Sequence, residues 1–173
     1  MFVLLISGSS RIGSTNGQFL NQLELSFPAI TFKRFDIDKL PLFDPNLKVS
    51  EYPKIVNNWR EIVANSEGVL ISTPEYIHNI PATLKNCLEW LSSTGEMLNK
   101  KVLPITLTPR PPRGQYAMSS LLHSLKALDA DLVAHMPLYL TEMGSAPDNM
   151  LSEDVLEMIE EGLKLIWNHL GKL

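Results

Sequence analysis

Small hydroxyl-bearing residues, two glycines and an arginine gather near the start of the chain. They occupy the stretch Ser7–Asn16, which follows the apolar run Phe2–Ile6, and such a run is typical of a buried strand. After the stretch, Phe19, Leu20 and Leu23 repeat at helical spacing. A loop between a strand and a helix N-terminus presents free backbone N–H groups and the positive end of the helix dipole, so this stretch is predicted to bind an anion.

The side chains of this loop suit a phosphate group. Arg11 carries a permanent charge and can bind two phosphate oxygens at once. Further donors are the hydroxyls of Ser9, Ser14 and Thr15 and the amide of Asn16. An ordinary strand–helix turn, with Ser14 as the helix N-cap, is the alternative interpretation. The stretch has neither G-x-G-x-x-G nor Gly-Lys-Ser/Thr, so it is not the usual dinucleotide fingerprint or a Walker loop.

Alternating strands and helices must position this loop. The predicted strands are Phe2–Ile6, Ile30–Ile37, Gly68–Thr73, Lys101–Leu107 and one within Leu132–Leu140, where Pro137 shortens it or places it near an edge. The first two predicted helices cover Ser14–Ser26 and Glu51–Asn65. Helix three has the stripe Ile80, Leu84, Cys87, Leu88 and Leu91, and helix four the stripe Met118, Leu121, Leu122, Leu125 and Leu128. The last helix, capped by Ser152, has the stripe Val155, Ile159, Leu163, Ile166 and Leu170.

This alternation predicts an α/β fold in which helices cover both faces of a parallel sheet, a doubly wound architecture. In such folds ligands bind beyond the carboxyl ends of the strands. Three loops leave those ends near the centre of the sheet: Ser7–Asn16, Pro74–Asn79 and Thr108–Gly114. We expect these three loops to converge on one pocket.

Composition limits the class of protein. The 173 residues favour a single domain over 1–173, and the net charge of −4 argues against non-specific nucleic-acid binding. The only cysteine, Cys87, lies on an apolar helical stripe, which predicts a core thiol and fits a reducing cytoplasm. The histidines show no ligand spacing, so no metal site is predicted, and the first apolar run is too short for a signal peptide or a membrane span.

Two long motifs resemble the NAD(P)H-dependent FMN reductase family, which includes quinone, azo-dye and chromate reductases. Residues Gly8–Asn16 are similar to the family's G-S-x-R-x-x-S-x-N loop. Thr73–Tyr76, Ile80–Pro81 and Leu84–Trp90 follow its P-E-Y-N-x-x-x-P-x-x-L-K-N-x-x-D-W pattern. Leu40–Phe43 also resembles the family's loop after strand two, so the resemblance extends over nearly the whole chain.

The resemblance implies a flavodoxin-like fold with five parallel strands in the order 2-1-3-4-5, and FMN as cofactor with NADPH or NADH as co-substrate. The predicted FMN-binding residues are Ser9, Arg11, Ser14, Thr15, Asn16, Pro74, Glu75, Tyr76, Ile77 and His78. Lys85, Asn86 and Trp90 would be structural, near a dimer interface on helix three. The flavin would supply the chemistry, so no catalytic side chain is assigned. The expected assembly is a homodimer or homotetramer.

Two segments depart from the family pattern. Ile77, His78 and Asn79 stand where the family has asparagine and small residues. The family's glycine-rich loop against the flavin pyrimidine is here the proline-rich Thr108–Gly114, and prolines lack the N–H groups that would bind ring carbonyls. Its Arg110 and Arg113 either attract an acidic substrate or the 2′-phosphate of NADPH, or are solvated loop charges.

Three functions remain open on the sequence. The first is an NAD(P)H oxidoreductase that passes electrons through FMN to a quinone, an azo compound, a metal oxyanion or free flavin. The second is a non-enzymatic electron carrier or redox sensor that binds FMN. The third is a phosphoryl-ligand binding domain without flavin, and the proline-rich loop motivates both alternatives.

Overall fold

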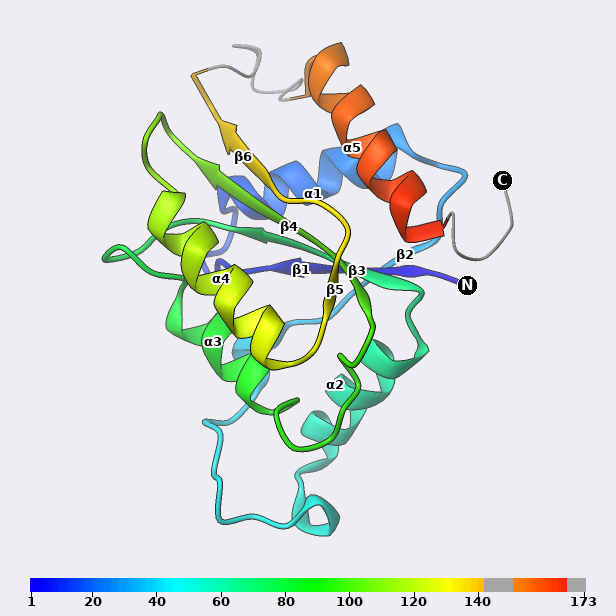
Figure 1. The fold of residues 1–173 in the computed structure, drawn as a ribbon, viewed down its shortest axis with the longest axis vertical. Helices are drawn as coiled ribbons and strands as arrows, with labels where there is room; N and C mark the ends of the chain where they lie inside the picture. Colours follow the sequence, from blue (N-terminus) through cyan, green and yellow to red (C-terminus); the bar gives the residue numbers. More distant parts are fainter. Residues whose placement is uncertain (142–150, 168–173) are drawn as a thin grey trace.

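A parallel β-sheet runs through the centre of the protein, and helices pack on both of its faces (Figure 1). The computed structural model describes residues 1–141 and 151–167. The strands are β1 Val3–Ser7, β2 Phe32–Arg34, β3 Gly68–Thr73, β4 Lys101–Thr108, β5 Asp131–Leu132 and β6 Met136–Tyr139. The helices are α1 Thr15–Ser26, α2 Lys54–Asn65, α3 Ala82–Glu89, α4 Gln115–Ala127 and α5 Glu153–Trp167. The order β2-β1-β3-β4-β5 confirms the predicted doubly wound, flavodoxin-like architecture.

The central strands are buried on both faces, as their unbroken apolar runs predict. Every side chain of β3 is buried, and it pairs in parallel with β1 on one side and β4 on the other. The register sets Ser7 beside Ser72 and Thr73 beside Thr106. The three strands therefore end together, and the loops that leave them begin at the same edge of the sheet.

The second strand is shorter than expected. Of the predicted Ile30–Ile37, only Phe32–Arg34 pairs with β1, and a 3₁₀ turn follows at Ile37–Lys39. Because β2 is an edge strand, its outer side has no neighbour that would prolong it. The turn places Ile37 in the core of the protein.

The fifth strand is divided into two short segments, β5 and β6, which both pair with β4. The break between them covers residues 133–135, although the N–H of Val133 still bonds to the carbonyl of Val102 at 3.1 Å. Pro137 lies in β6 at the edge of the sheet, where a missing N–H donor is tolerated. The prediction that Pro137 shortens this strand or places it near an edge is confirmed.

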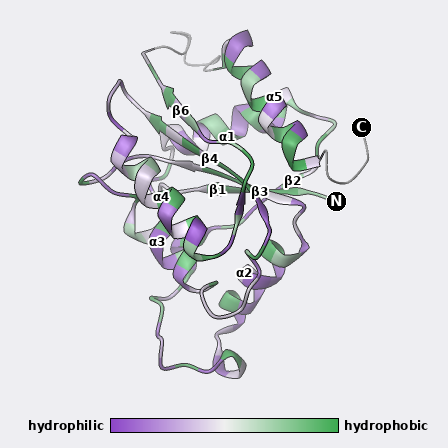
Figure 2. Ribbon diagram, viewed as in Figure 1, coloured by the Kyte–Doolittle hydropathy of each residue, from purple (hydrophilic) through white to green (hydrophobic). Residues whose placement is uncertain are grey.

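Each face of the sheet has its own core. Helices α2, α3 and α4 pack on one face around Trp59 and Trp90, and α1 and α5 pack on the other around Phe19 (Figure 1). The indole Nε1 of Trp59 donates to the carbonyl of Cys87 at 2.9 Å, so this large buried ring leaves no donor unpaired. In Figure 2 the helices carry both hydrophilic and hydrophobic segments, as two-faced helices against a sheet do.

Asn86 and Trp90 hold the loop that follows the 3₁₀ turn. The Asn86 amide accepts from the N–H of Phe43 at 2.8 Å and donates to the carbonyl of Pro41 at 2.9 Å. Trp90 Nε1 donates to the same carbonyl at 2.8 Å, and the Trp90 ring packs edge-on against Phe43. These contacts explain the motif positions Asn86 and Trp90 as structural. Their closeness to a dimer interface stays a prediction.

Both predicted N-cap serines accept a hydrogen bond from the first turn of their helix. Ser14 Oγ accepts from the N–H of Gly17 at 3.1 Å, and Ser152 Oγ accepts from the N–H of Val155 at 3.4 Å. Helix α2 begins at Lys54 rather than at position 51, because a 3₁₀ turn at Val49–Glu51 and the extended residues Tyr52 and Pro53 precede it. Leu170 of the predicted last stripe lies outside the described residues. Within the described ranges no helix is both long and apolar enough to cross a membrane.

Cys87 lies wholly inside the core, and burial raises the pKa of its thiol. The folded protein therefore keeps a proton that an unfolded cysteine releases above about pH 8.5. We expect the free energy of unfolding to fall as pH rises beyond that value, by at most about 1.4 kcal/mol per pH unit. Denaturant titrations at about pH 7.5 and 9.5 measure the slope, which Cys87→Ala should flatten. An unchanged slope in Cys87→Ala would assign the effect to other groups.

Candidate functional site

The three predicted loops converge on one pocket of about 360 Å³ at the carboxyl ends of the strands. It is lined by Arg11, Ser14, Thr15, Asn16, Pro74, Glu75, Tyr76, Leu107, Thr108, Pro109, Arg113 and Leu140. The prediction of a shared pocket, made from the alternation of strands and helices, is confirmed. Its size lies within the usual range for small-molecule sites.

The first wall of the pocket is the loop between β1 and α1, and its backbone donors are free. No acceptor among the described residues bonds to the N–H groups of Ser10, Ile12, Gly13, Thr15 and Asn16. Gly13 adopts a left-handed backbone with φ +66°, which turns the chain into the helix. The free N–H groups and the helix dipole make this wall an anion site.

Arg11 adds an unpaired charge to the same wall. No carboxylate among the described residues forms an ion pair with it. Ser14 Oγ, buried behind it, accepts the N–H of Gly17 and still has its own proton to donate. The cap interpretation and the anion interpretation of Ser14 are therefore compatible.

Ser9 and Tyr76 connect the first wall to the second. Their hydroxyl oxygens lie 3.4 Å apart, and Ser9 Oγ also accepts the N–H of Arg11 at 3.4 Å. Ser9 is buried and does not line the pocket, whereas Tyr76 lines it with about half of its surface exposed. Ser9 thus supports the backbone of the loop at Arg11.

The amide of Asn16 points into the protein. Its Oδ1 accepts from Ser72 Oγ at 2.7 Å, and its Nδ2 reaches the carbonyl of Leu107 at 3.5 Å. Asn16 therefore ties the first turn of α1 to β3 and β4. One amide hydrogen is left for a ligand, together with the free backbone N–H of the same residue.

The second wall, Pro74–Asn79, contains a tight turn with two left-handed residues. Tyr76 and Asn79 exchange backbone hydrogen bonds of 2.9 and 3.0 Å, while Ile77 and His78 have φ of +49° and +56°. A turn of this form favours asparagine and glycine. Ile77 is 99% exposed, and neither Ile77 nor His78 lines the pocket. Both predicted residues lie at the tip of the turn.

Ile77→Asn is expected to stabilise the protein by about 1 kcal/mol, because a β-branched residue is strained at positive φ and asparagine tolerates it. Denaturant unfolding of the variant measures the gain. Ile12→Asn is the matched control, since Ile12 is fully exposed in the neighbouring loop and has no positive φ. An equal gain in both variants would show that it comes from replacing an exposed apolar side chain and not from relief of backbone strain.

Glu75 lines the pocket, but its carboxylate is bound to α4. Its Oε2 accepts the N–H groups of Tyr116 and Ala117, both at 3.0 Å, and its side chain is only 9% exposed. The imidazole Nδ1 of His78 lies 3.5 Å from Oε1. The carboxylate is therefore occupied by the protein itself.

The third wall comes from the end of β4 and the proline-rich loop. Thr108 Oγ1 donates to the carbonyl of Arg113 at 2.8 Å, and the N–H of Arg113 donates to the carbonyl of Arg110 at 3.1 Å, which fixes the loop. Neither arginine forms an ion pair within the described part of the chain. Arg113 lines the pocket, so the charge left free there is positive.

Two lining residues were missed from the sequence, Leu107 and Leu140. Both are apolar and stand at or just after the carboxyl end of a strand, β4 or β6. An apolar residue in such a place carries no chemical signal. The signal that could have found them is position alone, since every parallel strand brings its last residues to this edge.

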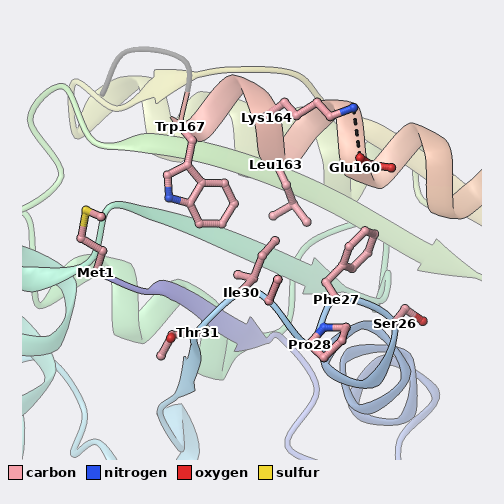
Figure 3. Close-up of a pocket in the computed structure, with 11 residues that line it drawn as sticks. Met1, Ser26, Phe27, Pro28, Ile30, Thr31, Glu160, Leu163, Lys164 and Trp167 are labelled. Atoms are coloured by element: carbon pink, nitrogen blue, oxygen red, sulfur yellow. Dashed lines mark ion pairs between the residues drawn. The ribbon is translucent and has the colours of Figure 1, made fainter. Parts of the chain in front are cut away.

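A larger hollow of about 480 Å³ lies elsewhere, between the end of α1, the segment before β2 and the last turns of α5 (Figure 3). Leu163 and Trp167 point from α5 toward Ile30 and Phe27. Its one ion pair among the residues drawn joins Lys164 and Glu160 at 3.0 Å. Because the hollow is mainly apolar and is not lined by the loops at the carboxyl ends of the strands, we assign ligand binding to the smaller pocket.

The donor set of the smaller pocket fits a flavin mononucleotide phosphate. A phosphate needs several N–H or O–H donors and a positive charge, and the first wall offers free backbone N–H groups, the Ser14 hydroxyl and unpaired Arg11. The third wall offers less to a flavin ring, because Pro109, Pro111 and Pro112 have no N–H.

Comparison with known proteins identifies the family. A family model described as NADPH-dependent FMN reductase matches residues 1–141. A quinone reductase of Escherichia coli (strain K12) is 31% identical over 165 residues, which cover 92% of this chain and 86% of that protein. An NADPH:quinone oxidoreductase of Arabidopsis thaliana is 27% identical over 147 residues, 80% of this chain and 74% of the relative.

Among solved structures, the flavoenzyme NAD(P)H:(acceptor) oxidoreductase FerB from Paracoccus denitrificans superimposes with a TM-score of 0.84. The superposition covers 97% of this chain and 98% of the FerB chain. Because the two sequences are only 22% identical, this likeness supports the fold alone. The family match extends further, because it spans residues 1–141 and so includes the phosphate loop and the motif after β3. The chain belongs to the NADPH-dependent FMN reductase family and is an FMN-dependent NAD(P)H oxidoreductase.

Proposed function

We propose that the 360 Å³ pocket holds FMN and that the protein passes electrons from NAD(P)H to a small quinone-type acceptor. The observation that carries the site is the row of free backbone N–H groups beside unpaired Arg11 at the start of α1. The names of the Escherichia coli and Arabidopsis relatives, a quinone reductase and an NADPH:quinone oxidoreductase, support the acceptor class.

The protein's residues bind and orient in this proposal. The phosphate is held by Arg11, Ser14, Thr15 and the backbone of Asn16. Ser9 accepts the N–H of Arg11 and so supports the backbone of the loop. Pro74, Glu75 and Tyr76 form the wall along the ring, and Ile77 and His78 border it at the tip of the turn. Bound FMN supplies the hydride and electron transfer.

A non-enzymatic electron carrier is the second candidate. The proline-rich wall favours it, because Pro109 lines the pocket and three of the loop's residues have no N–H to offer a ring carbonyl. A wall with few donors would hold the ring with little control over its reduction.

The decisive experiment loads the protein with FMN, removes the excess, and adds NADPH or NADH without oxygen while the visible flavin absorbance is recorded. Prompt bleaching, followed by turnover with a soluble quinone, is the expected result. Retained flavin that neither nucleotide bleaches would favour the carrier. Flavin that does not remain bound would contradict the proposed site.

We also propose that the chain is a single domain over residues 1–173, that it acts as a homodimer or homotetramer, and that it is cytoplasmic. One continuous sheet through the described residues supports the first point. Exposed Ile12, Ile77 and Tyr116 near the pocket support self-association, which light scattering of the loaded protein would test. A single cysteine that is buried fits a reducing compartment.

A further inference from the structure

Helix α4, which continues the third wall of the pocket, has no N-cap side chain of its own. Its N-cap is Gly114, with φ +100°. A Cβ at this position would lie 3.1 Å from Thr106 Oγ1 and from Thr108 Cγ2, so a serine or aspartate cap has neither the backbone conformation nor the space it needs. The first N–H groups of α4 must be satisfied from elsewhere.

Glu75 supplies this cap from across the chain. Its Oε2 accepts the N–H groups of Tyr116 and Ala117 at 3.0 Å each. The carboxylate is nearly buried, and a negative charge at a helix N-terminus is favourable both as a hydrogen-bond acceptor and toward the helix dipole. A residue of the loop after β3 is therefore joined to the helix after β4.

Two neighbours of Glu75 strengthen the same connection. The ring of His78 packs edge-on against Tyr116, with centroids 4.6 Å apart. Asn79 Oδ1 accepts from Ser120 Oγ at 2.6 Å and from the N–H of Ile80 at 2.8 Å. The strained turn at residues 77 and 78 is thus held on both sides by contacts to α4.

The capped helix and the capping loop belong to two different walls of one pocket. Pro74–Tyr76 lines one side, and Thr108, Pro109 and Arg113, which lead into α4, line another. We propose that Glu75 is a positioning residue, which sets the separation of these two walls by capping α4 from across the pocket. The inference rests on the proposed function, in which a flavin ring lies along Pro74–Tyr76.

The test compares FMN with riboflavin, which has the same ring and no phosphate. The phosphate donors are on the β1–α1 loop and not on the loop that carries Glu75. E75A should therefore raise the dissociation constants of FMN and riboflavin by the same factor, roughly 3- to 10-fold. E75Q should restore most of the affinity, since its amide oxygen can accept both N–H groups. Dissociation constants come from flavin fluorescence, and the visible circular dichroism of bound flavin should change in E75A.

Ser152→Ala is the matched control, because it removes the cap of α5, which packs on the opposite face of the sheet. It should lower the melting temperature and leave both flavin affinities unchanged. If E75A behaves like Ser152→Ala, Glu75 is only a helix cap and the proposal is wrong. A loss for FMN alone would also contradict it, because Glu75 would then act on the phosphate.

E75D keeps the inference testable if E75A does not fold. It retains the charge and shortens the side chain by one methylene. The two pocket walls must then move closer together, or the hydrogen bonds to the N–H groups of Tyr116 and Ala117 must break. Reduced affinity for both flavins is expected, and affinities equal to the native protein would overturn the proposal. If the native protein binds neither FMN nor riboflavin, the proposed function itself is wrong, and the inference falls with it.

Discussion

Arg11→Ala is expected to weaken FMN binding by roughly 1.5–3 kcal/mol, which is about a 10- to 150-fold rise in the dissociation constant. The guanidinium has no ion pair within the described residues and lines the pocket beside the free N–H groups of the β1–α1 loop. Its whole charge is therefore available to a phosphate. Fluorescence titration of the apoprotein with FMN measures the change.

Riboflavin separates phosphate binding from other effects of this substitution. Arg11→Ala should leave riboflavin affinity unchanged, because the ligand has no phosphate. Arg34→Ala is the charge control, since Arg34 pairs with Glu24 on the edge strand and is not among the residues that line the pocket. An unchanged FMN affinity in Arg11→Ala, or an equal loss for riboflavin, would remove Arg11 from the phosphate site.

Gly8→Ala is expected to destabilise the fold by about 1–3 kcal/mol and to weaken FMN binding as well. A Cβ at Gly8 would lie 2.5 Å from Thr73 Oγ1 and 2.8 Å from Thr73 Cβ. Thr73 is fully buried in the central strand β3 and is stiff at its branched Cβ, so it cannot easily move away. The loop must shift instead, and the Gly8 N–H bond to the Ser72 carbonyl, 2.7 Å long, would be strained.

A second substitution tests the steric cause. Thr73→Ala in the Gly8→Ala background removes the nearest oxygen and leaves the Cβ, so part of the lost stability should return. Denaturant unfolding of the two single variants and the double variant gives the coupling energy. Strictly additive effects would show that the loss at Gly8 has another origin.

The position of the pocket could be predicted because it depends on topology alone. Parallel strands end at one edge, and the phosphate loop, the motif after β3 and the loop after β4 were each visible as breaks in apolar runs. The cap at Ser14 was visible for a similar reason, since a local spacing specifies it.

The direction of individual side chains could not be predicted. Glu75 and Asn16 stand at motif positions, yet the Glu75 carboxylate caps α4 and the Asn16 amide ties α1 to β3 and β4. Both partners lie more than forty residues away in the chain, and no local pattern encodes such a pairing. The early end of β2 and the division of the fifth strand could not be predicted either, because both depend on which strands lie beside them in the sheet.

The free backbone donors of the β1–α1 loop have a consequence for how this protein can evolve. A main-chain N–H is present whatever side chain the residue carries, proline excepted, so substitutions at Ser10, Ile12 or Thr15 leave the donor in place. Mutation at these positions can therefore change the side chains on the loop's surface while the backbone donors of the anion site remain.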